Sequence, residues 1–542
     1  MDIFQHISTL VRGELHLDDT TRQRYAVDGS IFEITPAAVL APKDAADIQA
    51  VAHLLWTMAE NGKEVPALVP RGAGSDQAGG PLGAGIVLDM RAHMNQILEI
   101  GEDFVRCEPG VRYGELQDVL KARGRYLPPY PASLELCTIG GAVANNASGE
   151  KTVKYGDTRD YVESLKVVLA NGDEITVKAM TKAEIEGKTH RYSLEGKIYR
   201  ELARLLATHT RDESRPKFHV TKNSTGYAIW EVEHRGMFNL AKLFVGSQGT
   251  LGIITEITLR TELLPKETAL IGGYFDSIDK AAEAVEELLV LGPSALEIVD
   301  RNLLELVESR QPGHLEGLIP AQMPEIVLIV EFDDHNDRNR TGKGKAAKTI
   351  LKHYAYAHKE AEGPAEQERL WKLRRSAAAV IWTVDGPEKA LPIVEDGIVP
   401  AALLPEFFRR AYALFAKYEL KIAVWGHAGD ANLHMQPFMN LSDPAHREKI
   451  WPFVEDFHRL VIEMGGCISA EHNDGLLRSP YLKAQYGEEL YRLFRQVKHM
   501  FDPHEIMNPG KKVDVAIERI QQLVRHSYGL DHLVKDRELI NR

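Results

Sequence analysis

The chain has 542 residues, about three to four times a typical domain of ~150, and this length predicts two or three domains. Hydrophobic residues make up 44% and charged residues 26%, a balance that is ordinary for a globular protein and excludes a disordered or fibrous chain. The formal net charge of −13 opposes a large phosphate-binding surface, so no nucleic-acid partner is expected. The three cysteines, Cys107, Cys137 and Cys467, suit neither a disulfide framework nor an iron–sulfur cluster, and they indicate a reducing compartment.

The amino terminus predicts no export signal. Residues 1–19 carry acidic and polar side chains where a signal peptide needs a basic start followed by an apolar stretch. The sequence also contains no run of 18 or more apolar residues, so it predicts no membrane-spanning helix. We therefore expect a cytoplasmic protein, and peripheral docking to the inner face of the membrane stays open.

Hydrophobic periodicity divides the chain into an α/β region at 1–265, an α+β unit at 266–460 and a largely helical segment at 461–542. In the first region we expect a helix over 44–62, strands over 65–70, 85–90 and 165–170, a hairpin turn at Asn171-Gly172 and a helical insert over 178–215. In the second we expect a helix over 279–291, a strand over 325–332 and helices over 338–356 and 364–383. The third is predicted to contain one strand, over 467–470.

Three glycine-rich loops predict that main chain approaches a ligand closely. The densest is Pro70-Arg71-Gly72-Ala73-Gly74-Ser75-Asp76-Gln77-Ala78-Gly79-Gly80, which directly follows a predicted strand. It is neither a Rossmann fingerprint nor a P-loop, and taken alone it fits a structural turn nearly as well as a phosphate cradle. The stretches 138–149 and 246–255 are also rich in small residues. Three such loops in one region favour an extended ligand lying against main chain.

Two histidines flank a Gly-Asp-Ala-Asn core in the stretch 425–436. We predict a hairpin with a tight turn at Asp430-Ala431, which would place His427 and His434 directly opposite each other. Opposed residues have Cβ atoms ~4.5–5.5 Å apart, close enough for two imidazoles to share a metal ion. The alternative is two structural histidines that pair with each other or face solvent.

Glu471 and His472 follow the strand predicted over 467–470. The carboxylate could supply a third metal ligand, and the imidazole could accept a proton. In a regular strand the two side chains would point to opposite faces, so a shared site requires the strand to end here, as residues 473–475 indicate. A surface Glu-His pair is the alternative.

The three glycine loops resemble the PRGGGTS-like, TIGG-xxxxN-xxG and GSEGTLGIIT segments of flavoproteins of the vanillyl-alcohol oxidase type. The later GHxGDxNLH and EHxxG motifs resemble the D-2-hydroxyacid dehydrogenase branch, which includes D-lactate dehydrogenases, glycolate oxidase flavoprotein subunits and D-2-hydroxyglutarate dehydrogenases. The resemblance spans roughly residues 38–512. It implies an α+β fold with a PCMH-type FAD-binding domain, an α+β substrate or cap domain, and a C-terminal helical segment that returns to the flavin.

This resemblance implies bound FAD, and because the loops contain no obvious residue to tether it, we expect the binding to be non-covalent. The first loop would hold the pyrophosphate, the second would line the ribityl and isoalloxazine groups, and Ile254 would meet the adenine end. The implied cofactor-binding residues are Pro70, Arg71, Gly72, Ala73, Gly74, Ser75, Asp76, Thr138, Gly140, Gly141, Asn145, Gly149, Ile254 and Asn508. Ala73 replaces a family glycine, Asp76 a serine and Gln248 a glutamate. The Asp76 carboxylate would repel pyrophosphate unless it points away or pairs with Arg71.

The resemblance also implies the reactive residues. His427, His434 and Glu471 would bind a divalent metal, with zinc favoured and manganese or iron as alternatives, and His472 would be the catalytic base. Arg374 would clamp the substrate carboxylate, although a solvated helix arginine is the alternative reading of this residue. In the 2-hydroxyglutarate members a lysine precedes the Asp of the strand that follows this helix, and it helps to bind the distal carboxylate of the substrate. Here Val394-Glu395-Asp396 occupies that stretch, which favours a smaller or more apolar acid.

The expected activity is FAD-dependent oxidation of a small D-2-hydroxy acid, such as D-lactate, to the 2-oxo acid. The chain stops about 30 residues after Lys512, so we expect a separate electron acceptor: an iron–sulfur subunit, an electron-transfer flavoprotein, a quinone or a cytochrome. A homodimer is compatible with the sequence. Alternatives are a non-redox flavin transferase of the alkylglycerone-phosphate synthase type and a flavoprotein subunit of an electron-transfer complex. A zinc hydrolase would leave the glycine loops unexplained.

Overall fold

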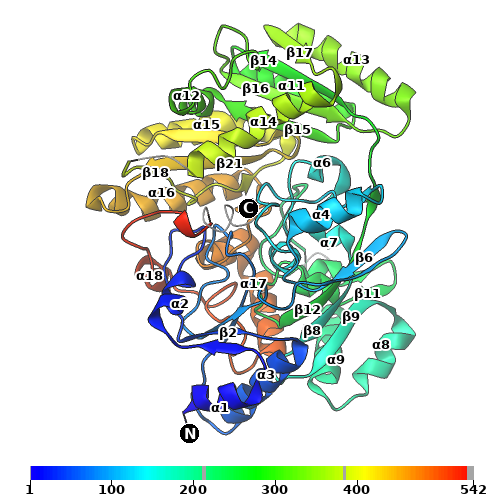
Figure 1. Ribbon diagram of the computed structural model, residues 1–542, viewed down its shortest axis with the longest axis vertical. Coiled ribbons are helices and arrows are strands. Elements are labelled where there is room, and N and C mark those ends of the chain that lie inside the picture. The colour runs from blue at the N-terminus through cyan, green and yellow to red at the C-terminus, as the bar shows by residue number, and fades with distance from the viewer. Residues whose placement is uncertain (1, 210–214, 383–385, 534–542) are drawn as a thin grey trace.

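The computed structural model describes residues 2–209, 215–382 and 386–533, without the side chains of 376–382. In Figure 1 the largest sheet and its helices, coloured green to yellow, lie above the blue and cyan segments of the amino-terminal part. The orange helices of the C-terminal part lie alongside both. In the described ranges, no helix is both long and apolar enough to cross a membrane.

A four-stranded sheet near the amino terminus positions the first glycine loop. Its order is β1 (Glu14–His16), β2 (Ala38–Ala41), β4 (Ile86–Asp89) and β3 (Leu68–Arg71), and the pairs β2–β4 and β3–β4 are parallel. Helix α3 (Ala45–Glu60) buries Ile48, Val51 and Leu55 against these strands. The predicted helix and both predicted strands are confirmed, and the first glycine loop leaves the carboxyl end of β3. Helices α1 (Ile3–Leu10) and α2 (Asp19–Arg24) flank this sheet.

A seven-stranded antiparallel sheet carries the other two glycine loops. Its order is β10 (Glu233–His234), β11 (Met237–Asn239), β9 (Glu174–Thr181), β8 (Val162–Val168), β12 (Ile253–Arg260), β6 (Phe104–Cys107) and β5 (Ile97–Ile100). Strands β8 and β9 form the predicted hairpin, and Gly172 in its turn has a φ of +88°. The helices are α4 (Tyr113–Lys121), α5 (Ile139–Asn145), α6 (Thr152–Tyr155), α7 (Thr158–Tyr161), α8 (Lys182–Thr189), α9 (Leu194–Thr208) and α10 (Ala241–Phe244). A separate pair joins β7 (Arg125–Tyr126) to β13 (Glu262–Leu263).

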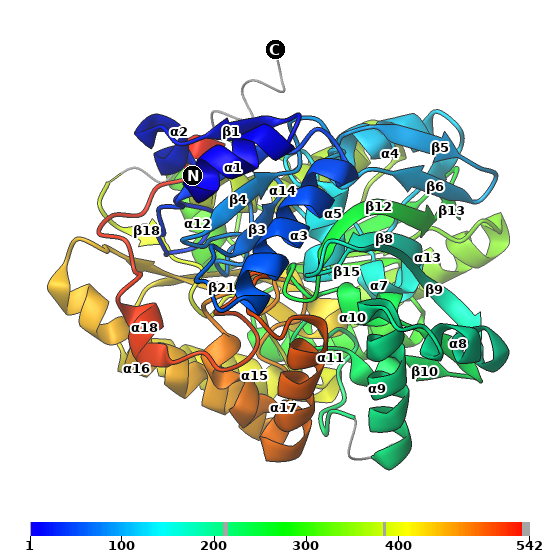
Figure 2. The same cartoon turned by 90° about the horizontal axis from the view of Figure 1, so that it is seen from below.

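The predicted helical insert over 178–215 needs adjustment. Residues 178–181 belong to β9, the helices are α8 and α9, and residues 210–214 lie outside the described ranges. Figure 2 shows α9 next to α17, which the contacts between these helices confirm.

The largest sheet is antiparallel, and helices pack on both of its faces. Its order is β17 (Ala357–Glu360), β14 (Ala269–Phe275), β16 (Ile326–Phe332), β15 (Ala295–Asp300), β20 (Ile422–His427), β21 (Asn432–Met439) and β18 (Lys389–Ala390), with β19 (Gly397–Ile398) paired to β21. In β16, Leu328 and Val330 join one core while Val327 and Ile329 join the other, because successive side chains point to opposite faces. The helices are α11 (Ile278–Val290), α12 (Arg301–Arg310), α13 (Asp337–Tyr354), α14 (Gly363–Trp382) and α15 (Leu404–Lys417).

The C-terminal part is helical, with α16 (Pro444–Glu463), α17 (Leu482–Phe501) and α18 (Ile517–Gln521). The strand predicted over 467–470 is wrong, because only one bridge, Cys467 to Ile398, forms there. Beyond it, the side chain of Asp396 takes the place of a strand partner: it accepts hydrogen bonds from the backbone N–H groups of Glu471 and His472. The segment is therefore an irregular loop.

Candidate functional site: a cofactor cavity with a histidine cluster

One cavity of about 190 Å³ unites the glycine loops with the predicted reactive residues. Residues of all three loops line it, together with Arg374, His434, Glu471 and His472. Of the predicted cofactor residues, twelve line the cavity: Pro70, Arg71, Gly72, Ala73, Gly74, Ser75, Asp76, Thr138, Gly140, Gly141, Asn145 and Ile254. Gly149 and Asn508 are not among the lining residues.

The first loop offers main-chain donors to the cavity. In the described part of the chain, the backbone N–H groups of residues 72–77 donate to no protein acceptor. Gly74 has a φ of +73°, and a Cβ there would lie 2.2 Å from the guanidinium of Arg71. That guanidinium donates to the carbonyls of Tyr25 (3.3 Å) and Val27 (2.8 Å). The Arg71 side chain thus braces the loop from behind, and the loop's N–H groups are left for an anion.

Asp76 points toward the other two loops and away from Arg71. Its Oδ1 accepts hydrogen bonds from the N–H groups of Ala78 (2.5 Å) and Gly80 (3.4 Å). Its Oδ2 accepts from the side-chain amides of Asn145 (2.9 Å) and Gln248 (3.3 Å). The described contacts of Asp76 include none with Arg71, and Asp76 instead joins the three glycine loops.

Asn508 ties the C-terminal segment to the loops from outside the cavity. Its Nδ2 donates to the carbonyls of Gly80 (3.1 Å) and Gln248 (2.6 Å). Gly149 permits a close approach, because a Cβ there would lie 2.1 Å from the carbonyl of Tyr130. Both residues shape the cavity through main chain and lie behind its wall.

The predicted hairpin is present, but its predicted register is wrong. The connection is a 3₁₀ turn over Ala428–Asp430, so His427 pairs with Asn432, and His434 pairs with Trp425. The two histidines are therefore diagonal neighbours. Their rings still meet edge to face with centroids 5.3 Å apart, because diagonal partners on one face of a hairpin remain within reach of large side chains.

Three imidazoles converge on one oxygen of Glu471. Its Oε1 lies 3.3 Å from Nε2 of His427, 3.3 Å from Nε2 of His434 and 3.6 Å from Nε2 of His472. The rings of His434 and His472 stack with centroids 5.1 Å apart. All of these groups are buried except His472, whose side chain is 24% exposed. A carboxylate among three ring nitrogens is the donor set expected for a divalent cation.

The opposite nitrogen of each ring is held in place, as is usual for metal-ligating histidines. Nδ1 of His427 contacts Oε1 of Glu297 at 2.8 Å, and Nδ1 of His434 contacts the carbonyl of Glu395 at 2.8 Å. Nδ1 of His472 contacts Oε2 of Glu395, whose other oxygen accepts from Arg478 at 2.5 Å. These contacts aim every Nε2 at Glu471.

Asp396 lies near this cluster, and its ligand atoms group with those of His434, Glu471 and His472 within 4.8 Å. Its oxygens are already used, however. Oδ2 accepts from Ser469 (2.5 Å) and from the N–H groups of Glu471 and His472, and Oδ1 accepts from Asn432 (3.1 Å). These contacts show that the Asp396 carboxylate holds the loop.

Burial and neighbouring charge shift the pKa of these groups strongly. Burial disfavours the Glu471 carboxylate, but Lys222 and His427 hold its pKa well below the ordinary value. Burial likewise disfavours a charged His472, yet Glu395 raises the pKa of this imidazole to about 10. Against the same burial penalty, Glu297 raises the pKa of His427 to about 8.

Arg374 lies on α14 and lines the cavity, so it is not a solvated helix arginine. Its Nε donates to Oε2 of Glu297 at 2.8 Å. The same carboxylate holds His427, which links the arginine to the histidine cluster.

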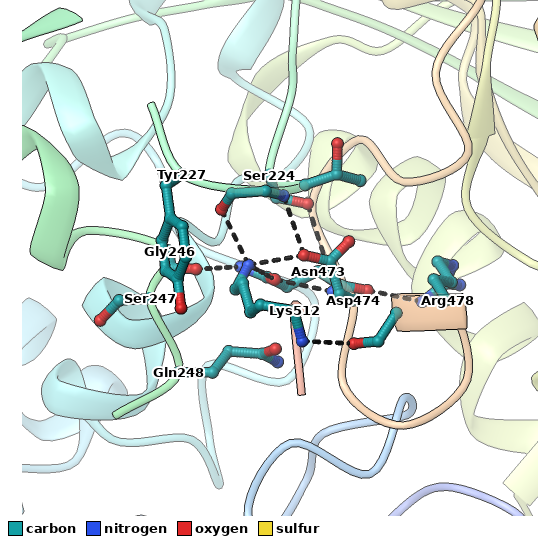
Figure 3. Close-up of polar contacts among 12 residues, drawn as sticks. Ser224, Tyr227, Gly246, Ser247, Gln248, Asn473, Asp474, Arg478 and Lys512 are labelled. Carbon is teal, nitrogen blue, oxygen red and sulfur yellow. Dashed lines mark hydrogen bonds and ion pairs between the residues drawn. The ribbon is translucent and has the colours of Figure 1, made fainter. Parts of the chain in front are cut away.

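Several buried polar residues escaped the sequence reasoning. Glu297 interrupts the apolar run of β15, and an isolated acid in a buried strand is a signal that could have revealed it. A second group surrounds the acid–base loop in Figure 3: Lys512 donates to Asn473 (2.6 Å), Asp474 (2.6 Å) and the carbonyl of Gly226 (3.0 Å). Asn473 in turn binds the carbonyl of Gly246 (2.9 Å).

The fold places the chain in a class. Residues 36–178 match the family described as FAD binding domain, and residues 264–512 match FAD linked oxidases, C-terminal domain. The fold is shared with 4-ethylphenol oxidase from Gulosibacter chungangensis, at a TM-score of 0.70 and 16% identity over 96% of this chain and 98% of that one. It is also shared with p-cresol methylhydroxylase, at a TM-score of 0.68 and 14% identity over 94% of this chain and 96% of that one. The molecule is a PCMH-type flavoprotein.

Sequence relatives narrow this class. The chain is 30% identical to glycolate oxidase subunit GlcD of Bacillus subtilis, with 92% of this chain and 94% of that protein covered. It is 28% identical to a D-lactate dehydrogenase of Archaeoglobus fulgidus over 88% of this chain and 91% of that protein. It is 30% identical to D-2-hydroxyglutarate dehydrogenase of Pseudomonas putida over 92% of this chain, which spans 50% of that longer protein. The chain belongs to the family of FAD-linked oxidases.

Proposed function

We propose that this chain oxidises a D-2-hydroxy acid to the 2-oxo acid and passes the electrons through FAD to a separate acceptor. The supporting observation is the single cavity, which brings cofactor loops, a buried arginine and a histidine–carboxylate cluster together. Relatives over most of the chain are named for D-lactate, glycolate and D-2-hydroxyglutarate.

The cavity fits FAD at its glycine-loop end. The main-chain N–H groups of residues 72–77 suit a pyrophosphate, and the Asp76 carboxylate is engaged by the N–H of Ala78 and the amide of Asn145. When bound, FAD would supply the hydride acceptor for the oxidation. The three cysteines are buried and apart, so we assign the onward transfer of electrons to a partner outside this chain.

The cluster fits a divalent cation held by His427, His434 and Glu471. Zinc suits this nitrogen and oxygen set, and manganese and iron also suit it. When bound, the cation would lower the pKa of an adjacent hydroxyl, and its charge would favour the neutral form of His472.

Arg374 and His472 have different roles toward the substrate: Arg374 binds it, and His472 accepts its proton. The guanidinium of Arg374 binds the carboxylate of the 2-hydroxy acid, and Glu297 fixes the orientation of that guanidinium through Nε. Nε2 of His472 takes the proton of the hydroxyl, and Glu395 at Nδ1 stabilises the imidazolium that forms. Val394 precedes Glu395 and is buried, so it supplies no cation for a distal carboxylate, which favours a small side chain on the substrate.

Anaerobic flavin bleaching tests this proposal. FAD-loaded protein is mixed with the D and L forms of lactate and 2-hydroxyglutarate and with glycolate, and the flavin absorbance is followed. A D-2-hydroxy acid should bleach the flavin and its L enantiomer should not. His472→Ala should keep FAD but lose bleaching, whereas the exposed His499→Ala on α17 should behave as wild type. Absence of bleaching by every acid, or normal bleaching in His472→Ala, would refute the assignment.

The non-redox transferase is not favoured. Alkyldihydroxyacetonephosphate synthase shares the fold at a TM-score of 0.63 with 18% identity over 94% of this chain and 84% of that one, which speaks for the fold alone. The relatives found by sequence over most of the chain are named as dehydrogenases and an oxidase subunit.

A further inference from the structure

Lys222 is a fully buried cation that contacts the side chain of Glu471. It lies in an irregular segment between α9 and the 3₁₀ turn Ile229–Glu231, its side chain is 0% exposed, and it does not line the cavity. Burying an ammonium is costly unless carboxylates pair with it. Against that burial penalty, Glu471 and Asp430 raise the pKa of Lys222, so it stays charged.

Two donors reach Glu471 from behind. Nζ of Lys222 lies 3.0 Å from Oε2 of Glu471, and the hydroxyl of Ser148 donates to the same oxygen at 2.8 Å. Lys222 is held by Asn432 (3.2 Å) and by Asp430 (3.7 Å) from the histidine hairpin. With Oε2 fixed by two donors, the carboxylate cannot rotate, and Oε1 faces the three imidazoles.

The segment that carries Lys222 is itself aligned with the acid–base loop. Ser224 accepts a hydrogen bond from the N–H of Asn473 at 3.0 Å, and the N–H of Gly226 donates to Asp474 at 2.9 Å (Figure 3). Glu471 is therefore positioned relative to residues 222–226 by contacts at three successive places.

We propose that Lys222 is a positioning residue that fixes Glu471 as a one-oxygen ligand for the divalent cation. The inference rests on the metal part of the proposed function. The positioning effect of Lys222 and its positive charge should change the affinity for the cation in opposite directions. A fixed ligand strengthens cation binding, whereas a bare positive charge 3.0 Å from the ligand carboxylate would weaken it. Whether the cation affinity falls or rises when Lys222 is removed therefore shows which of the two effects is larger.

The test measures zinc affinity of the FAD-loaded, oxidised protein by competition with a chromophoric chelator. Lys222→Met removes the donor and the charge together, and Ser148→Ala removes the other donor and keeps the charge. Because partners that orient a ligand typically contribute a factor of about 10 to 100 in affinity, Lys222→Met should weaken zinc binding by that range. Ser148→Ala should weaken it in the same direction by a smaller factor.

Lys151→Met is the matched control, because Lys151 is also buried and paired with a carboxylate, Glu331, but neither lines the cavity nor contacts the cluster. It should lower the thermal unfolding midpoint without changing zinc affinity. Equal or tighter zinc binding in Lys222→Met, or equal weakening in all three variants, would overturn the inference alone. If wild-type protein binds no zinc, both the inference and the proposed metal fail. If Lys222→Met does not fold, Ser148→Ala decides.

Discussion

The contact between Asp76 and Gln248 explains two departures from the family loops at once. The glycine-loop region resembles relatives that carry serine at the first position and glutamate at the second. Here the carboxylate has moved to Asp76, and the amide of Gln248 donates to it at 3.3 Å and to Asn145 at 3.1 Å. Gln248→Glu would place two carboxylates at that separation. At an effective dielectric constant of about 20, their repulsion is about 5 kcal/mol, part of which proton uptake or rotation would relieve.

FAD affinity, measured by flavin fluorescence, is the assay. We expect Gln248→Glu to weaken FAD binding about 10- to 100-fold, or about 1.4 to 2.7 kcal/mol, because the three loops that line the cofactor cavity would separate. Asp76→Ser combined with Gln248→Glu should recover most of this loss, since only one carboxylate remains. The expected coupling energy between the two sites is about 1 to 3 kcal/mol. If the effects of the single variants simply add, the two positions are independent and the explanation fails.

Three further predictions address the site and the stability of the fold. Glu297→Gln should weaken both zinc affinity and flavin bleaching about 10-fold or more, because the single amide oxygen cannot accept hydrogen bonds from both Arg374 and His427. Glu331→Gln, at another buried glutamate, is the control and should change neither. Burial and the charge of Arg478 lower the pKa of His458 to about 3. Between about pH 6.5 and pH 3 this imidazole is therefore protonated only in the unfolded state, so the free energy of unfolding decreases as the pH is lowered. His458→Phe should remove about 2 kcal/mol of the loss between pH 7.5 and 5, seen as a smaller shift of the thermal midpoint; an unchanged shift would contradict this. Chelation should abolish substrate-dependent bleaching with FAD retained, and Zn²⁺ or Mn²⁺ should restore it; bleaching in metal-free protein would exclude the catalytic cation.

Much of the fold could be predicted because local patterns decided it. The amphipathic spacing of α3, the buried run of β16 and the Asn171-Gly172 turn each specify their element without long-range information. The residue types of the site could also be predicted, since glycine loops and paired histidines are rare in combination.

The register and the supporting residues could not be predicted. The hairpin at His427 has a 3₁₀ connection instead of a two-residue turn, which shifts the pairing and makes the histidines diagonal. The stretch 467–470 forms only one bridge, to Ile398, and the N–H groups that follow it bond to the side chain of Asp396, a residue more than 70 positions earlier. Glu297, Glu395 and Lys222 orient the cluster only because the tertiary fold brings distant segments together.

The loops that line the cofactor cavity also hold the turn that carries Glu471 and His472. The carbonyl of Ala78 accepts from the N–H groups of Leu476 (2.7 Å) and Leu477 (3.1 Å), and Oε1 of Gln248 accepts from the N–H of Gly475 (2.9 Å). A cofactor that orders these loops therefore also orders the acid–base turn. By linkage, a cation that fixes the turn must favour the cofactor to the same degree. The two parts of the cavity are structurally joined, because each glycine loop also contacts the turn that follows Glu471 and His472.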